Sequence, residues 1–544
     1  KRESYDMLMG LRLKRESNMK KLMYGAAALT LLTACGGEEA ATEVTITEPT
    51  LKELTVRAGD ASEAADALAA MSLTNSGTGV LSFAGSTTDG ATATFTDLTI
   101  TGENAVKVGS LVLEGLDMEG SQANFGKMSL NDITISEEGE DVEVKLGSIE
   151  LVNPSPELAG WLAASLNGQE VPFPAADKIV FDSWSMNGLT GDFSDTEAEG
   201  TFGIDKIEIR DMTNLKAAKA TISGLSLVGT DESEGMDFDI QLGSMTATNV
   251  DAKFVQAIQE NVDDEEAMVA ALMDMAYDNP MEPGYDSFKL DGLNVDVAGA
   301  TFTIPNLVAG VERNSAGQAT KFVTEPYSMT LKADSAGGEV GEALLQGLSV
   351  VGYEELELKG AGVMTYDPDQ DIVSFDAGSN YLELVDGAKF SMGGKIEGYS
   401  AYSQDIASAF DIEELTAGAE PDPAAMTNAL GKLTFHNFEL SIDDNSLLDR
   451  AFNAAATAQG ADPAEMKSQI GMGLAMAPMM AQGSGVDMAL VTEATTALSS
   501  FISEGGTLTF KLNPDTPLSV ASIMANPDPA AYTKDSLGFT ATQK

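Results

Sequence analysis

Few residues in this chain have types and spacings that could do chemistry. His436 is the only histidine and Cys35 the only cysteine, which excludes a zinc site built from two imidazoles or from several thiolates. A catalytic histidine needs a nucleophile within hydrogen-bond reach, and we interpret His436 as a surface or bulge residue on a strand. The G-x-S-x-G, phosphate-loop and G-x-G-x-x-G patterns are missing. We therefore expect no catalytic residues, no metal and no cofactor.

The acidic residues offer two weaker candidates. Asp367-Pro368-Asp369-Gln370-Asp371 resembles the start of a calcium loop, but Ile372 and Gly378 stand where such a loop has Gly and Glu. A hairpin turn between Tyr366 and Val373 fits this segment better. Paired carboxylates could also hydrolyse a glycosidic bond. Because the chain has 85 Asp and Glu, spacing alone identifies no such pair.

Composition bounds the class of protein. The 544 residues are 43% hydrophobic and 21% charged, which is typical of a globular chain and not of a disordered one. A net charge of −54 argues against nucleic acid as a partner, because no basic stripe could neutralise phosphates. The length allows several domains or one long repeat array.

The N-terminal stretch indicates where the protein resides. Met19-Lys20-Lys21 precedes an apolar run that ends at Leu32-Thr33-Ala34-Cys35, and this run is too short to span a bilayer. The stretch resembles the signal peptide and lipobox of bacterial lipoproteins. The resemblance implies cleavage between Ala34 and Cys35 and acylation of Cys35, so that the protein would be anchored by lipid. Gly36, where an Asp would retain the protein in the inner membrane, favours the outer membrane.

Four related strand segments show that the body is duplicated. They begin at residues 106, 144, 202 and 240, and share patterns such as Val-Lys-Leu-Gly-Ser. The second pair repeats the first with an offset of 96 residues. We therefore divide the chain into segments, which are an upstream extension 1–18, a signal peptide 19–34, a flexible tether 35–50, an N-terminal segment 51–105, repeats at 106–201, 202–301 and, more divergent, 302–431, and a C-terminal helical module 432–544.

Within each repeat the pattern predicts strands with a break. Apolar residues alternate at 106 and 108 and again at 111 and 113, with Gly109-Ser110 between them. We expect such glycines, also at 147 and 243, to bend the strand and send its apolar face to the other side. The sheet should then curl and leave a concave side. A helix closes each repeat, and Phe254 to Met273 have helical spacing in the second.

The C-terminal stretch changes character. It predicts a strand at 433–442, helices at 447–458 and 488–503, a helix start at Asp462-Pro463, and strands at 507–512 and 538–542. The fold class is therefore mainly β with helices: an elongated antiparallel β repeat array of about 96-residue units, one helix each, capped by a C-terminal β-ααα-β module.

Methionines on one C-terminal helix are the strongest remaining signal for function. Met472, Met476 and Met480 recur at helical spacing. Methionine provides an adaptable apolar surface, yet at this spacing it usually forms core, which is the arrangement we expect here. The candidate contacts to an apolar ligand, from this helix and the concave side of the repeats, are Met236, Met245, Phe254, Ile258, Met472 and Met476.

A lipobox, a β-rich repeat body and apolar helices together resemble the AsmA- and YdgA-like periplasmic proteins of Gram-negative bacteria. The resemblance covers residues 90–400 and implies a role in the envelope, with the AsmA-like proteins associated with phospholipid transport along an apolar groove. A lipid anchor in place of their membrane helix is a departure from that pattern.

We expect a non-enzymatic lipoprotein of the outer membrane, facing the periplasm or exposed at the surface. It would bind lipid or another apolar ligand, or scaffold an envelope protein. One alternative is a surface-exposed structural protein or adhesin. A carbohydrate-active enzyme on a β repeat scaffold is the third, and with only two tryptophans it offers few sugar-stacking platforms.

Overall fold

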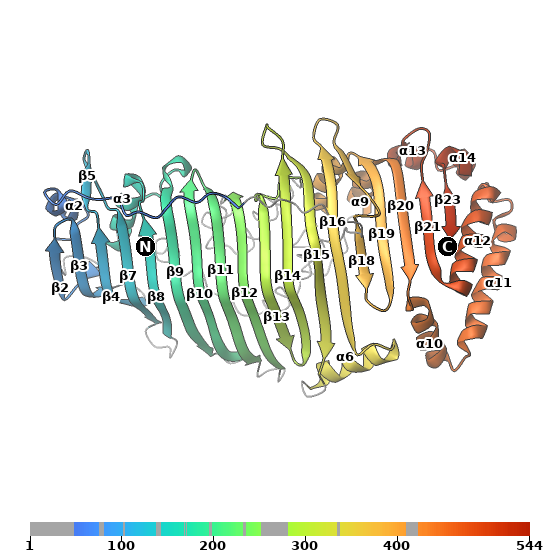
Figure 1. Ribbon diagram of the computed structural model, residues 1–544, viewed down its shortest axis with the longest axis horizontal. Coiled ribbons are helices and arrows are strands. Elements are labelled where there is room, and N and C mark those ends of the chain that lie inside the picture. Colours follow the sequence, from blue (N-terminus) through green and yellow to red (C-terminus); the bar gives the residue numbers. More distant parts are fainter. Residues whose placement is uncertain are drawn as a thin grey trace. The chain divides into compact units, whose positions relative to one another are not determined.

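The computed structural model describes residues 48–544, except 75–80, 102–103, 138–142, 168, 170, 195–197, 232–235, 252–280, 335–337 and 410–422. The chain is mainly β, its strands pair antiparallel, and helices gather toward the C-terminus. It divides into two compact units, and Figure 1 labels helices and strands of both. Among the described residues, unit 1 comprises 48–251 and 284–298, and unit 2 comprises 281–283 and 299–544. The predicted sites Ala34, Cys35, Phe254 and Ile258 lie outside the described residues.

The described part of unit 1 consists of one antiparallel sheet, a separate β5–β6 hairpin and two helices on one face of the sheet. The helical elements are α2 (Ala64–Ala70), α3 (Pro156–Leu166) and a 3-10 turn at Ala176–Lys178. The strands are β1 (Leu81–Ser82), β2 (Gly85–Asp89), β3 (Thr92–Ile100), β4 (Asn104–Glu114), β5 (Asp117–Glu119), β6 (Gln122–Asn124), β7 (Lys127–Glu137), β8 (Glu143–Val152), β9 (Val180–Ser194), β10 (Ala198–Thr213), β11 (Lys216–Asp231), β12 (Met236–Asp251) and β13 (Ser287–Val297).

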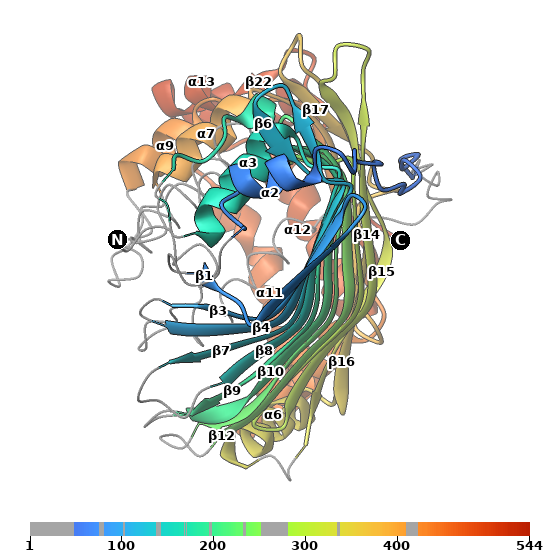
Figure 2. The same cartoon turned by 90° about the vertical axis from the view of Figure 1, so that its left-hand side faces the viewer.

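The strands of unit 1 follow one another as a meander. From β3 the pairing runs through β4, β7, β8, β9, β10, β11, β12 and β13, each strand antiparallel to the next. Strands β1 and β2 both pair with β3. Figure 2 shows this sheet strongly bent, with α2 and α3 on its concave side.

A crease crosses the sheet of unit 1 at one level. At this level every second strand has one residue with positive φ. The two residues that face each other there are not paired by backbone hydrogen bonds. For example, Leu146 pairs with Leu189 and Ser148 pairs with Asn187, and Gly147 faces Gly188 between these two pairs. The positive-φ residues are Asp97, Asp132, Gly188, Gly224 and Gly292, on β3, β7, β9, β11 and β13.

The crease repeats with the predicted 96-residue offset. A Cβ atom built on Gly147 would lie 3.0 Å from the carbonyl oxygen of Asn187, and one built on Gly243 would lie 3.0 Å from that of Asp291. Each of the two glycines faces a positive-φ glycine, Gly188 or Gly292. The Gly-Ser pairs at 147 and 243 therefore lie in matching surroundings.

The prediction that the apolar face changes sides at these glycines is wrong. Val108, Leu111 and Leu113, from both sides of Gly109, are all buried in one core. The physical reason is that two reversals occur at the same place. The order of apolar and other residues shifts by one position at the crease, and the backbone conformation there shifts the alternation of side-chain directions by one position as well. The two reversals cancel, so one face of the sheet stays apolar along the whole strand.

Unit 2 also contains an antiparallel meander. Its strands are β14 (Ala300–Arg313), β15 (Ala319–Ala333), β16 (Glu355–Asp367), β17 (Ile372–Phe375), β18 (Tyr381–Leu384), β19 (Ala388–Glu397), β20 (Thr434–Asp444), β21 (Gly506–Leu512), β22 (Leu518–Ser519) and β23 (Thr540–Gln543). Its helical elements are α6 (Glu339–Val350), α7 (Tyr399–Ala409), α9 (Pro423–Leu430), α10 (Leu447–Gln459), α11 (Pro463–Ala481), α12 (Met488–Glu504), α13 (Val520–Ala525), a 3-10 turn at Pro529–Ala531 and α14 (Lys534–Leu537).

The predicted β-ααα-β order of the C-terminal module is confirmed by β20, α10, α11, α12 and β21. The caps explain where these helices begin and end. Asp462 accepts a hydrogen bond from the N–H of Ala464 at the start of α11, with Pro463 in the first turn. Gly460 ends α10 in the left-handed conformation. Helix α12 packs on β21 and β23 through a small core of Ala497, Phe501, Leu508 and Ala541.

Candidate apolar binding face

The concave face of the unit 1 sheet is apolar across nine strands. Side chains at matching register positions form rows perpendicular to the strands, and each row continues through directly paired neighbours. One such row is Phe95, Leu111, Leu130, Ile149, Met186, Ile207, Ile222, Met245 and Leu290. Such cross-strand contacts are the unit of stabilisation in a sheet.

Burial along this face falls from one end to the other. Near β3–β8, the rows pack under α2 and α3, and Leu111 and Leu113 are at most 2% exposed. On β10–β13, the corresponding side chains are only half-buried. They are Phe202, Ile204, Ile207, Ile209, Ile222, Leu225, Leu227, Ile240, Leu242, Met245, Phe288, Leu290, Leu293 and Val295. We call this half-buried part the open apolar face.

The opposite face of the same strands is polar. A row that alternates with the apolar one consists of Glu150, Ser185, Glu208, Thr221, Thr246 and Lys289. The contrast between the two faces explains why the sheet has a solvent side and a core side. It also means that a substitution can be placed on either face of a single strand.

Two of the predicted contact residues lie on β12. Met245 belongs to the open apolar face, where it pairs with Ile222 on β11 and Leu290 on β13. Met236 is the first residue of β12, pairs with Asp231, and is half-buried. Met472 and Met476 are on α11 in unit 2. The two pairs therefore belong to separate units.

A cavity of about 490 Å³ lies between α2, α3 and β6 in unit 1. Met71, Ala123 and Trp161 contribute to its wall, and the ring of Trp161 meets that of Phe173 edge-on with centroids 4.9 Å apart. This cavity is small and partly polar, and its lining residues do not belong to the apolar rows of the sheet. It is therefore separate from the open apolar face.

Residues 48–60 form a strap across the strand ends of unit 1, visible as the dark-blue trace in Figure 1. Asn153 holds the strap: its Oδ1 accepts from the N–H of Arg57 at 2.8 Å, and its Nδ2 donates to the carbonyl oxygen of Thr55 at 2.8 Å. Asp211 accepts from the N–H of Lys52 at 2.8 Å. Both polar residues have positive φ, which asparagine and aspartate tolerate better than most residues.

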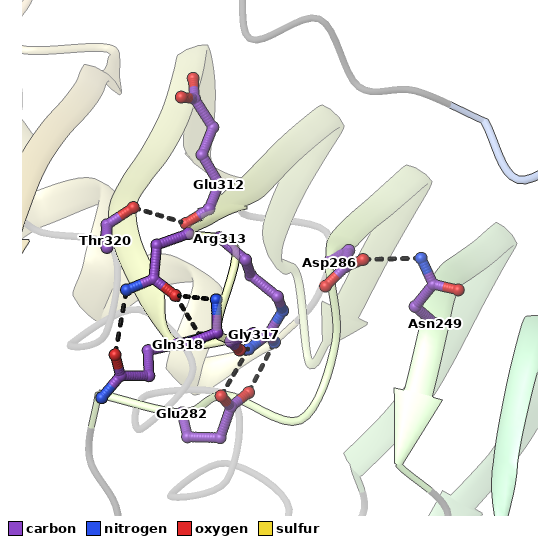
Figure 3. Close-up of polar contacts among 10 residues, drawn as sticks. Asn249, Glu282, Asp286, Glu312, Arg313, Gly317, Gln318 and Thr320 are labelled. Carbon is purple, nitrogen blue, oxygen red and sulfur yellow. Dashed lines mark hydrogen bonds and ion pairs between the residues drawn. The ribbon is translucent and has the colours of Figure 1, made fainter.

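The second repeat carries the same polar pair. Nδ2 of Asn153 donates to Asp182 at 2.6 Å, and Nδ2 of Asn249 donates to Asp286 at 2.6 Å (Figure 3). Asn249 also has positive φ. The offset from Asn153 to Asn249 is again 96 residues. The Asn–Asp pair whose asparagine binds the strap in the first repeat is therefore duplicated in the second.

The candidate chemical residues are placed as the sequence indicates. The hairpin turn is confirmed, because Asp367 on β16 pairs with Ile372 on β17. His436 lies at a bulge in the β19–β20 pairing, and its Nε2 is 3.0 Å from Oε2 of Glu397. In the described part of the chain, no group of three or more His, Cys, Asp or Glu side chains is placed to hold a metal ion.

Sequence reasoning missed two features of this unit. Asp97 and Asp132 take crease positions that have glycine on β9, β11 and β13, so the pattern of glycines alone does not indicate them. The available signal was a spacing of three between apolar residues, as in Met186 and Leu189. Residues 48–50 of the strap belong to the predicted flexible tether and residues 51–60 to the predicted N-terminal segment. The sequence indicates no contacts for either part, because the partners Asn153 and Asp211 are far away in the sequence.

Comparisons with known proteins identify little. A family model described as "Uncharacterized protein" matches residues 381–544, within unit 2. No curated protein matches the chain. None of the described helices has the length and apolar character needed to cross a membrane.

Proposed function

We propose that this protein is a non-enzymatic, lipid-anchored lipoprotein of the bacterial envelope that binds a lipid or another apolar molecule on the open apolar face. The observation that supports this best is the change in burial along one continuous surface. Half-buried aliphatic rows on β10–β13 continue rows on β3–β8 in which most side chains are buried. A contiguous apolar surface that stays partly accessible is a candidate binding site.

The dimensions of the open apolar face suit an elongated ligand. Strands lie about 4.7–4.9 Å apart, so the rows from β10 to β13 extend over about 14 Å across the sheet. Four rows lie side by side and give the face width as well as length. An acyl chain lying across the strands would contact a row of Ile, Leu and Met side chains without meeting a charge.

The anchoring part of the proposal rests on the lipobox resemblance at Leu32–Cys35. We propose the outer membrane as the location, with the body facing the periplasm. The mass of the N-terminal peptide of the mature protein tests this, because acylation of Cys35 adds the mass of its acyl chains. An unmodified Cys35 in protein purified from the native membrane would contradict the anchor.

The binding part is tested with substitutions on the two faces of the same strands. The detergent-extracted full chain is purified, and its co-purifying lipids are quantified by mass spectrometry. We expect the variant Met245→Gln/Leu290→Gln to retain about one tenth of the lipid, since two polar groups would lie under the ligand. The matched control, Thr246→Gln/Lys289→Gln, changes paired residues on the polar face and should retain it all.

Two outcomes would contradict lipid binding. One is a wild-type protein with no bound lipid or other apolar molecule after extraction. The other is an equal amount of lipid in both variants, which would place the lipid elsewhere. The first outcome would favour the structural or adhesin alternative.

A further inference from the structure

Helix α11 is the part of unit 2 whose surface is least like the rest of the chain. Residues 468–486 contain no charged side chain, although the whole protein has a net charge of −54. No residue of α11 is buried. The sequence predicts Met472, Met476 and Met480 to form core, but they are exposed (59%, 54% and 79%), and Met479 is 72% exposed beside them.

The exposed methionines form one stripe on the helix. Positions 472, 476, 479 and 480 follow one another at spacings of four, three and one, which places them along one side. The helix is held from its other side by α12, where Gly471 approaches Ser499. Near its start, Lys467 forms an ion pair with Asp449 and lies over the ring of Phe452 on α10. The methionine stripe therefore faces away from the helices that hold α11.

The stripe begins with an acidic residue. Glu465 is exposed and lies seven positions before Met472, two helical turns earlier on the same side. The stripe thus has one carboxylate two helical turns before its exposed methionines. Anchors at such spacings, with flexible methionine side chains, are the features by which a groove or helix face receives an apolar helix.

We propose that the methionine stripe of α11 docks an apolar helix of a partner protein that carries Lys or Arg at one end. Charge decides between this occupant and others. A second copy of this chain would bring another −54 charges, and anionic lipid would likewise be repelled. A cationic helix is attracted over long range by the acidic protein and at short range by Glu465.

The test uses the full-length protein and a synthetic helix of leucine and lysine as the probe. Binding is measured by titration calorimetry, and 13C-methyl methionine spectra show which methionines the peptide contacts. The variant M472Q/M476Q/M479Q/M480Q keeps good helix formers throughout and should weaken binding at least tenfold. Glu465→Gln should weaken it about threefold. Met524→Gln, which changes an exposed methionine of α13, should leave it unchanged.

Several outcomes would overturn the proposal. Equal binding by wild type and the quadruple variant would show that the peptide responds to overall charge alone. A peptide with glutamate in place of lysine that binds as tightly would remove the charge argument. Phosphatidylcholine vesicles that bind in place of the peptide, or a dimer that the quadruple variant abolishes, would assign the stripe to lipid or to self-association.

Discussion

Asn153 is the residue on which the strap depends most. Its side chain makes two hydrogen bonds to the strap backbone, and glycine would keep its positive φ while removing both. At about 0.5–1.5 kcal/mol per hydrogen bond, Asn153→Gly should make opening of the strap roughly tenfold easier. We expect faster trypsin cleavage after Lys52 and Arg57, measured by mass spectrometry. Asp132→Gly makes the same change at another positive-φ position and should leave cleavage after Lys52 and Arg57 slow; equal acceleration in both variants would contradict the assignment.

A second prediction at this scale concerns Glu493 of α12. Its carboxylate pairs with Lys534 and accepts from the N–H of Ala541 at 3.0 Å, and these hydrogen bonds lower the pKa of Glu493. Because the pKa of Glu493 is lower in the folded state, its ionised carboxylate stabilises the fold at pH values above the unfolded-state pKa near 4.3. This stabilisation is lost as the pH falls through the folded-state pKa. We therefore expect Glu493→Gln to lower the melting temperature at pH 7 and to have little effect near pH 3. Glu342→Gln, on the exposed side of α6, is the control, and a pH-independent effect of Glu493→Gln would refute the mechanism.

At the scale of elements, the crease leaves little room for a side chain at Gly147 and Gly243. A methyl group on Gly147 or Gly243 would press on a backbone carbonyl oxygen at 3.0 Å, and backbone cannot move aside as a flexible side chain can. We expect Gly147→Ala and Gly243→Ala to destabilise the protein by about 1–3 kcal/mol each, measured by urea unfolding. The two costs should be similar because the surroundings match.

The control for these substitutions is Gly160 in α3, where a methyl group would meet no atom within 4 Å. Gly160→Ala should stabilise the protein by about 0.5–1 kcal/mol, because alanine is the better helix former. A neutral Gly147→Ala together with a costly Gly243→Ala would mean that the two repeats differ in a way the crease does not reveal.

At the scale of the whole molecule, the net charge of −54 should make stability depend on salt. Like charges repel one another in the compact state, and a Debye length that falls from about 30 Å at 0.01 M salt to about 3 Å at 1 M screens this repulsion. We expect the melting temperature to rise by several degrees over that range of sodium chloride. A rise that needs divalent cations at equal ionic strength would indicate specific ion binding instead.

Local pattern in the sequence determined much of the architecture. Alternating apolar residues predicted the strands, and the 96-residue offset related Gly147 to Gly243 before any contact was known. Gly460 and the Asp462-Pro463 pair located the end of α10 and the start of α11. These signals are readable because caps and alternation depend on residues that are close in sequence.

Tertiary structure alone decided three points. The side on which Leu111 lies relative to Val108 depends on the backbone conformation at the crease, and several residue types can adopt that conformation. The strap depends on Asn153 and Asp211, which meet it only after eight strands have paired. Methionines at helical spacing look the same in the sequence whether they are packed or exposed, because exposure depends on which face of α11 meets α12.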